Sequence, residues 1–577
     1  MITPTRSGIP RKTDFETLTA ALDYAAGAES GFTFYSPRGE PLSVLPYGEM
    51  RARVDERAMQ IAGLGLAPGD RVAMIGETTP DFVIAFLAAV RARLVPVPLP
   101  VAGVFTEPSR YAEQVGRQLA GCGARLFLRP DGASLLPEGA DTPEMSWSEL
   151  AAAPKGAAPL AEPGPDDICY LQYSSGSTRF PRGVAVTHSA LVRNCRDISE
   201  AAIGAGPDDR MVSWLPLYHD MGLVGTLLAP IVAQASVDFL STDTFARRPM
   251  VWLQLISRNR GTVSYAPCFG YDLVRRRANA SQIADLDLSS WRVAGVGAEM
   301  IDPQVMERFC ETFAPAGFRS EAVLASYGLA EATLGVTFAP LDRGIETDRV
   351  DPESLGRHRR AVLSNAPTAR SFVRCGRPLP SQRVEIRGPN GEALPPRVAG
   401  RVVISGASVM QGYFNDPEAT AKALDGEGWL DTGDVGYMAE GDLVIVGRAK
   451  DTIIVNGRNV WPQDLEWIVE QIPAVRNQSC AAFGIHEPGA GERAVVLVQS
   501  GLRDPGERAA LIASAHRDIL QATGLDCRIV LVPPHSLPRT SSGKLNRGLA
   551  RERYLAGNFE ATEADALAGS RQAVAAR

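Results

Sequence analysis

The chain lacks a strong basic charge, a membrane-length apolar run and any closely paired cysteines. Its 577 residues carry a formal net charge of −7, whereas nucleic-acid-binding proteins usually show a basic stripe. No apolar run reaches the ~20 residues of a membrane span, since the best candidate, Phe82 to Pro100, contains two arginines. The eight cysteines form no C-x-x-C pair, and the amino terminus has no signal-peptide core. We therefore expect a cytoplasmic protein with reduced thiols, no membrane span and no nucleic-acid partner.

Length and periodicity favour several α/β units. A single hydrophobic core stops growing near ~250–300 residues, so this chain is long enough for more than one domain. Apolar residues recur at helical spacing from Tyr47 to Leu66, a strand is expected at Arg71 to Ile75, and a helix from Asp81 to Val90. This order predicts a largely parallel sheet covered by helices.

Strand-like runs return in the second half of the chain. Arg383 to Ile386 and Arg401 to Ile404 are bounded by Gly/Pro turns and predict a small β-rich subdomain. Another strand is expected at Leu443 to Val446. The alternating strands and helices from there to about Tyr554 are enough for a small separate domain.

The segment from Leu341 to Arg374 has many charges and little periodicity. A solvated surface insertion explains this residue character.

A loop from Tyr173 to Val184 is the strongest candidate for chemistry. It combines glycines, hydroxyls and two arginines, Arg179 and Arg182, after a buried strand expected at Ile168 to Leu171. The amides and hydroxyls of such a loop can donate to phosphate oxygens, and arginines add charge-assisted contacts. The spacing is not that of a Walker A motif. Taken alone, the loop is equally compatible with a polar surface turn.

Five further clusters contain residues that can perform chemistry, and each also has a purely structural explanation. The structural explanations, in chain order, are a histidine that only needs a hydrogen-bond partner, a helix start, a plain turn, a solvated linker and an exposed basic loop. The clusters are His219–Asp220, Tyr327 to Glu331, the Gly turn at Asp434, Arg448 to Lys450, and Lys544 after a flexible Gly turn.

In this order, the loop and the five clusters resemble the adenylate-forming superfamily of acyl-CoA synthetases, luciferases and peptide-synthetase adenylation domains. The resemblance extends from about Thr17 to Arg553. It implies a large α/β amino-terminal domain, residues 1–447, with parallel sheets, helices and a small β-rich subdomain. A small mobile α+β carboxy-terminal domain, residues 448–577, would carry the catalytic lysine.

Within the superfamily the sequence is most similar to the fatty acyl-AMP ligases. Ser174 to Arg179 reads Ser-Ser-Gly-Ser-Thr-Arg as in that subfamily, whereas typical acyl-CoA synthetases have glycine where this chain has Arg179. Leu217 to Gly222 and Gly457 to Glu466 are also similar. The subfamily carries an extra segment before Cys375, so the resemblance implies an insertion at about 341–374.

The resemblance implies that a medium- or long-chain fatty acid reacts with ATP to give acyl-adenylate and pyrophosphate. A carboxylate with a pKa near ~4.3 is already ionised at pH 7, so this reaction needs no general base. Lys544 would contact the α-phosphate, His219 would lie near the reacting carboxylate, and Glu331 would bind Mg²⁺. The implied nucleotide-binding residues are Ser174, Ser175, Gly176, Ser177 and Thr178 for the phosphates, Gly297, Ala298, Glu299, Tyr327 and Gly328 around the adenine, and Asp434 and Arg448 for the ribose, with Lys450 at the hinge.

The acceptor of the acyl group separates the alternatives. Fatty acyl-AMP ligases transfer it to the phosphopantetheine arm of an acyl carrier protein, for polyketide, lipopeptide or lipid synthesis. A long-chain acyl-CoA synthetase, the main alternative, would transfer it to coenzyme A. A catalytically silent binding protein is a third hypothesis, opposed by the intact Lys544, Glu331 and Asp434. The chain lacks the Phe-Asp-x-Ser element expected of an amino-acid-activating domain.

Overall fold

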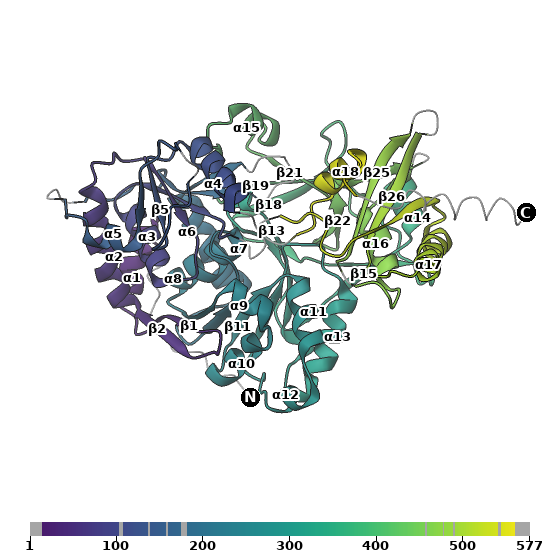
Figure 1. The fold of residues 1–577 in the computed structure, drawn as a ribbon, viewed down its shortest axis with the longest axis horizontal. Coiled ribbons are helices and arrows are strands. Elements are labelled where there is room, and N and C mark those ends of the chain that lie inside the picture. Colours follow the sequence, from purple (N-terminus) through teal and green to yellow (C-terminus); the bar gives the residue numbers. More distant parts are fainter. Residues whose placement is uncertain are drawn as a thin grey trace, which may run out of the picture.

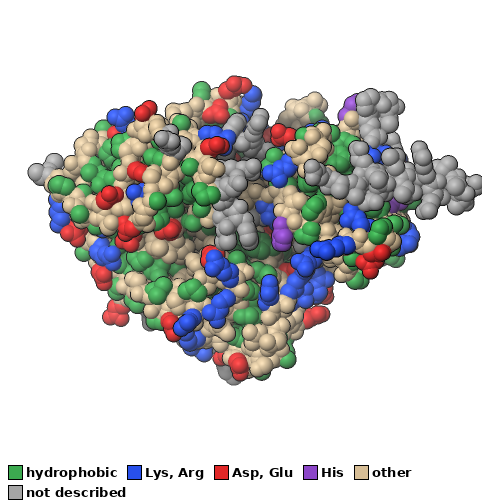
Figure 2. All heavy atoms as spheres, viewed as in Figure 1, with side chains coloured by type: hydrophobic (Ala, Val, Ile, Leu, Met, Phe, Trp, Pro, Cys, Tyr) green, Lys and Arg blue, Asp and Glu red, His purple; other side chains and the backbone are tan. Residues whose placement is uncertain are grey.

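The computed structural model describes residues 14–102, 108–136, 139–156, 160–174, 182–455, 458–476, 478–487, 491–540 and 544–559. In Figure 1 the first elements of the chain, in purple and blue, lie on the left, and the last strands and helices, among them β25, β26 and α17, form a lobe on the right. Figure 2 shows both acidic and basic side chains on this face, with Lys and Arg side chains gathered in its lower middle. No helix in the described ranges combines the length and apolarity needed to cross a membrane.

A nine-stranded sheet forms the centre of the amino-terminal part. Its strands from β13 through β12, β11, β9 and β10 to β1 are paired in parallel. Both faces of this sheet are packed. Met211 and Val212 are neighbours on one strand, so their side chains point to opposite faces, and they belong to two different hydrophobic clusters. In spatial order the strands are β17 (Arg377–Pro378), β14 (Gly335–Phe338), β13 (Val323–Gly328), β12 (Val293–Val296), β11 (Val263–Ala266), β9 (Arg210–Ser213), β10 (Ser236–Leu240), β1 (Gly31–Tyr35) and β2 (Pro41–Pro46).

A second sheet is wholly parallel, with the strand order β4-β3-β5-β6. Its strands are β3 (Arg71–Ile75), β4 (Val95–Leu99), β5 (Leu126–Arg129) and β6 (Glu144–Ser146). Helix α3 (Pro80–Arg91) begins where Thr79 accepts the amide of Phe82 and Pro80 occupies the first turn. Helix α2 (Tyr47–Ala62) ends at Gly63, earlier than the predicted Leu66. The predicted α/β fold is confirmed.

The β-rich subdomain is an antiparallel sheet in the order β18-β19-β21-β22. Its strands are β18 (Gln382–Arg387), β19 (Gly400–Gly406), β21 (Leu430–Ala439) and β22 (Asp442–Arg448). A three-stranded sheet, β20-β8-β7, holds the two ends of the phosphate-loop candidate. It is formed by β7 (Ile168–Tyr173), β8 (Gly183–Thr187) and β20 (Gly412–Tyr413).

The charged segment 341–374 is packed, not only solvated. It forms β15 (Thr347–Val350), helix α14 (Pro352–His358) and β16 (Arg370–Val373), with β15 and β16 antiparallel. Buried side chains from all three elements share a hydrophobic cluster with Tyr437 and Trp461. Its status as an insertion stays a prediction.

The chain after Arg448 has hydrophobic clusters of its own. The predicted domain boundary at 447/448 stays a prediction. This part contains β23 (Ile453–Val455), β24 (Arg458–Val460), α16 (Pro462–Glu470), β25 (Cys480–Glu487), β26 (Gly491–Gln499), α17 (Pro505–Thr523), β27 (Cys527–Val532) and α18 (Arg547–Leu555).

The remaining helices cover the sheets or connect their strands, and two of them are π-helical. The α-helices are α1 (Leu18–Ala25), α4 (Pro108–Cys122), α5 (Trp147–Ala152), α6 (His188–Arg196), α7 (Asp220–Gly222), α8 (Ala229–Ala233), α9 (Thr242–Arg247), α10 (Met250–Asn259), α11 (Cys268–Arg277), α12 (Ala280–Ala284), α13 (Pro303–Phe313) and α15 (Pro417–Ala423). The π-helices are η1 (Asp197–Ala202) and η2 (Leu223–Leu228); the 3-10 helices are η3 (Ala314–Ala316), η4 (Ser320–Ala322), η5 (Ala330–Ala332) and η6 (Ala449–Asp451).

Candidate active site

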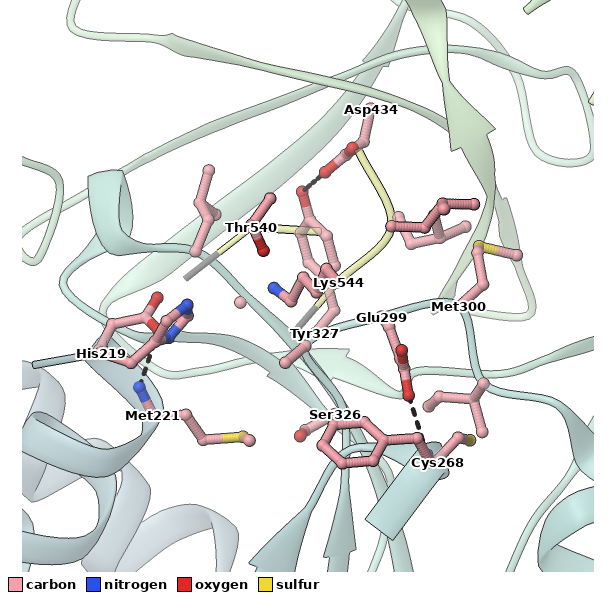
Figure 3. Close-up of a pocket in the computed structure, with 18 of the residues that line it drawn as sticks. His219, Met221, Cys268, Glu299, Met300, Ser326, Tyr327, Asp434, Thr540 and Lys544 are labelled. Carbon is pink, nitrogen blue, oxygen red and sulfur yellow. Dashed lines mark hydrogen bonds and ion pairs between the residues drawn. The ribbon is translucent and has the colours of Figure 1, made fainter. Parts of the chain in front are cut away.

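A cavity of about 670 Å³ lies where the amino-terminal sheets meet the carboxy-terminal lobe. Residues that follow the carboxyl ends of the parallel strands β9, β11, β12 and β13 line one side of it. This edge is where open α/β sheets usually bind ligands. The other side is lined by residues of β21, β22, α16 and the segment before α18. Figure 3 shows side chains from both sides pointing into the same space.

The turn after β12 brings backbone close to the cavity. A Cβ at Gly297 would lie 2.9 Å from the carbonyl oxygen of Ser326, so only glycine fits there without a shift. Ala298 adopts a left-handed φ of +68°, which is uncommon for a residue other than glycine and marks a strained position. Glu299 Oε1 accepts the amide of Phe269 at 3.0 Å. Burial raises the pKa of Glu299, although the Phe269 amide and Lys544 counteract this.

Tyr327 and Asp434 meet across the cavity wall. The Tyr327 hydroxyl donates to Asp434 Oδ2 at 2.7 Å, and Arg448 Nε donates to Oδ1 of the same carboxylate at 3.2 Å. Asp434 is 7% exposed and lies beside Gly433, whose φ is +79°. Asp434 raises the pKa of Arg448. The structure thus brings together three residues that the sequence resemblance placed around adenosine.

Glu331 lies on a short 3-10 turn, η5, after β13, and not at the helix start considered from its sequence. Its Oε1 accepts the Tyr413 hydroxyl at 2.9 Å, while its backbone carbonyl accepts the Met410 amide. Burial raises the pKa of Glu331. Gly328 permits this turn, because a Cβ there would lie 1.9 Å from the Leu334 carbonyl oxygen.

His219, from the amino-terminal part, and Lys544, from the carboxy-terminal part, both face the cavity (Figure 3). His219 Nδ1 lies 2.5 Å from Asp220 Oδ1, and its buried Nε2 has no hydrogen-bond partner among the described residues. Burial raises the pKa of Asp220, but His219 and Lys544 outweigh it and lower the pKa overall. The side chain of Lys544 makes no ion pair to a described residue, so its ammonium remains available to an anionic ligand.

Some predicted site residues lie outside the described ranges. Ser175, Gly176, Ser177, Thr178 and Arg179 are outside the described residues. Ser174 lines the cavity.

Arg182 also lines the cavity, although it is bound to neighbouring residues. It pairs with Asp416 at 3.2 Å, and its guanidinium lies 5.4 Å from the Tyr413 ring centroid. Lys450, the predicted hinge residue, lines the cavity from η6 with an exposed side chain.

Two further polar residues of the site, Tyr413 and Arg547, were not predicted, and Asp220 was named only as part of the His219–Asp220 cluster without a role of its own. Tyr413 and Arg547 had no local signal, because their partners Glu331 and Glu466 are 82 and 81 residues away. Arg547 and Glu466 form a two-point ion pair with N–O distances of 2.7 and 2.6 Å, which fixes the carboxy-terminal wall.

Part of the cavity lining is apolar, and we call the space beside these side chains the apolar arm. Ile198 from η1 and Gly225 from η2 line it, so both π-helical segments contribute. Such segments are frequent at functional sites. The other apolar lining residues include Ile203, Met211, Met221, Leu334 and Phe338.

Comparison with known proteins agrees with this geometry. Residues 38–414 match the model of the family described as "AMP-binding enzyme". The chain belongs to this family. AMP-binding enzymes of this type form adenylates from ATP, so the protein is an adenylate-forming enzyme and ATP is its nucleotide substrate.

Relatives of this AMP-binding enzyme match over nearly its whole length. A putative acyl-CoA synthetase of Caulobacter vibrioides is 44% identical, over 97% of this chain and 99% of its own. A medium-chain-fatty-acid–[acyl-carrier-protein] ligase, JamA of Moorena producens, is 32% identical, over 96% and 97%. A structure from a study of fatty acyl-adenylate ligases of E. coli and L. pneumophila is 43% identical, with a TM-score of 0.91, over 95% and 99%. The predicted resemblance to fatty acyl-AMP ligases is confirmed.

Proposed function

We propose that this enzyme activates a medium- or long-chain fatty acid with ATP and passes the acyl group to the phosphopantetheine arm of an acyl carrier protein. One observation carries the proposal: the apolar arm opens into the same cavity that Lys544, Tyr327 and Asp434 line. A fatty acid in the arm would therefore present its carboxylate beside the bound nucleotide.

The chemical difficulty of the first step is electrostatic. The ionised carboxylate attacks the α-phosphate of a polyanion, a new O–P bond forms, and pyrophosphate leaves. No proton needs to be removed. In-line positioning and neutralisation of the phosphate charge supply the catalysis. Lys544 provides a positive charge at this point, and Asp220 holds His219 in a fixed orientation beside it.

We assign nucleotide binding to residues from both sides of the cavity. Asp434 accepts hydrogen bonds from the ribose hydroxyls, with Arg448 beside it. The Tyr327 ring and the Gly297–Glu299 turn border the adenine. The phosphate loop, Ser174 to Thr178, holds the β- and γ-phosphates. The short distances among Tyr327, Asp434 and Arg448 support a preformed site.

Glu331 is the proposed protein ligand for Mg²⁺. Among the described residues no group of three ligating side chains gathers. A single carboxylate fits Mg²⁺, which usually combines one or two carboxylates with substrate phosphates and water. When bound, the ion neutralises charge on the phosphates. Tyr413 orients Glu331 for this role.

A carrier protein is the proposed acceptor. Its support is the name of the relative JamA, Arg179 in the phosphate loop, and contacts that tie segment 341–374 to the carboxy-terminal part. Asn459, for example, donates to the Gly356 carbonyl at 3.3 Å. Lys450 is the proposed hinge between residues 1–447 and 448–577. We also propose a cytoplasmic location, supported by eight free cysteines.

ATP/pyrophosphate exchange across fatty acids of different lengths tests the first step. We expect exchange that depends on fatty acid, and a loss of about 10²–10³ in rate in Lys544→Ala, the scale for one preorganised donor. ATP binding should persist in this variant. Repeating the assay with CoA and with a holo carrier protein tests the second step, and abundant acyl-CoA would instead indicate an acyl-CoA synthetase.

A further inference from the structure

We propose that Ile203, with Met211, forms the floor of the apolar arm and sets the longest acyl chain that the enzyme activates. This inference rests on the fatty acid substrate proposed above.

A second, smaller cavity lies directly beyond this floor. It shares Ile203, Met211 and Gly225 with the main cavity, and it has a volume of only about 10 Å³. That volume holds about one water molecule. Its other walls are mostly small or apolar and include two polar residues, Ser199 and Asp209; the small or apolar members are Ala205, Ala229, Pro230, Ala233, Ala235 and Val263. The wall between the two spaces is therefore formed by side chains, above all Ile203 and Met211, which are 3% and 5% exposed.

The backbone of Ile203 is held by an ion pair between Arg292, which is partly exposed, and the buried Asp209. Arg292 Nη1 donates to the carbonyl oxygen of Ile203 at 2.8 Å. The same guanidinium binds both oxygens of Asp209, at 2.9 and 2.8 Å, and Asp209 accepts the Gly206 amide at 3.0 Å. Both ends of the loop from Ile203 to Asp209 are thus held. Because its backbone is tied in this way, Ile203 does not withdraw for a longer chain, and we expect a sharp upper limit on chain length.

Removing the floor should join the two cavities. In Ile203→Ala the optimum in kcat/KM for acyl-AMP formation should move to chains about two methylenes longer. Each methylene that becomes buried contributes about fourfold, since burial of a CH₂ is worth about 0.8 kcal/mol. The double variant Ile203→Ala/Ala233→Leu refills the far space and should restore the original limit. Ile231→Ala, a buried position on α8 that lines neither cavity, controls for general destabilisation.

A variant that should shorten the accepted acyl chain keeps the test independent of Ile203. A Cβ at Gly225 would lie 3.1 Å from Leu334 Cδ2, so Gly225→Ala narrows the arm between Gly225 and Leu334. We expect its profile to shift toward shorter chains.

The readout is ATP/pyrophosphate exchange with saturated fatty acids of increasing length, for the wild type and each variant. Opposite shifts in Ile203→Ala and Gly225→Ala would support the inference. Unchanged length profiles in both variants, with a wild type that activates fatty acids, would overturn it. A wild type that activates no fatty acid of any length would instead overturn the proposed function.

Discussion

The hydroxyl of Tyr327 donates a 2.7 Å hydrogen bond to Asp434, a residue 107 positions further along the chain. We expect Tyr327→Phe to raise the KM for ATP about tenfold, because a hydrogen bond to a charged group is worth about 1.5–3 kcal/mol and Arg448 retains part of the site. Pyrophosphate exchange at varied ATP concentration measures this. Tyr265→Phe is a matched control, since Tyr265 lines the cavity and its buried hydroxyl has no hydrogen-bond partner among the described residues. Equal KM values in both variants would contradict the assignment.

The pH dependence of adenylation should report Lys544. Burial lowers the pKa of this lysine and Arg448 lowers it further, while Asp220, Glu299 and Asp434 partly offset the shift. The ammonium is charged below its pKa, so kcat/KM should fall as pH rises through a value below the ordinary ~10.4 of lysine. Lys544→Arg stays charged, and its residual activity should lack this alkaline limb. The same limb in both proteins would exclude Lys544 as its origin.

Asn194 should stabilise the loop that carries Glu331. Its side-chain amide donates to the Gly335 carbonyl at 2.8 Å and accepts the Gly335 amide at 2.9 Å, fully buried. Asn194→Ala leaves both backbone groups unpaired, and we expect the free energy of unfolding to fall by about 2–4 kcal/mol. Urea unfolding measures this.

Within the same loop Thr333, at φ +70°, donates to the Ser408 carbonyl at 2.8 Å. Thr333→Ser, which keeps the hydroxyl, should therefore lower the free energy of unfolding less than Thr333→Val.

Acid should destabilise the fold through His188. This buried ring accepts the Leu18 amide at Nδ1, 3.1 Å away, and burial lowers its pKa to about 4. The unfolded chain, with a pKa near ~6.5, binds the proton more readily. The contribution is therefore complete above pH ~6.5 and is lost as pH falls toward 4. We expect a loss of about 2 kcal/mol between pH 7 and pH 5. His188→Gln should flatten this part of the stability profile, and an unchanged slope would refute the role.

Arg370 should influence which acceptor is used. From β16 it forms an ion pair with Asp464 of α16, and its guanidinium lies 5.4 Å from the Trp467 ring centroid. Because these contacts hold the carboxy-terminal part against segment 341–374, we expect Arg370→Ala to form more acyl-CoA while acyl-AMP formation changes less than about twofold. Arg357→Ala, an exposed arginine of the same segment paired with Glu353, is the control. Equal acyl-CoA formation in the two variants would contradict this role.

Sequence patterns predicted the fold where local periodicity decides it. Arg71–Ile75 is a strand as predicted, and α3 contains the predicted helix Asp81 to Val90. The predicted end of α2, Leu66 before the break at Pro68 and Gly69, lies four residues beyond the observed end at Ala62, because the helix already ends at Gly63.

The candidate site was predictable only where residues are adjacent or match a family motif. Pairs such as Tyr413–Glu331 depend on how distant segments fold together, and neither local sequence marks the other. The left-handed turn at Ala298 was also not predictable, since alanine rarely adopts it.

The packing of β15, α14 and β16 has a practical consequence for testing acceptor choice. Val350, Leu355 and Phe372 fill one cluster with Tyr437 and Trp461, so excising residues 341–374 would strip both rings of their neighbours. Such a truncated enzyme would aggregate or unfold, so its acyl transfer to CoA or to a carrier protein could not be compared. Acceptor selection in this protein must therefore be dissected by point substitution at the edge of the segment, not by deleting it.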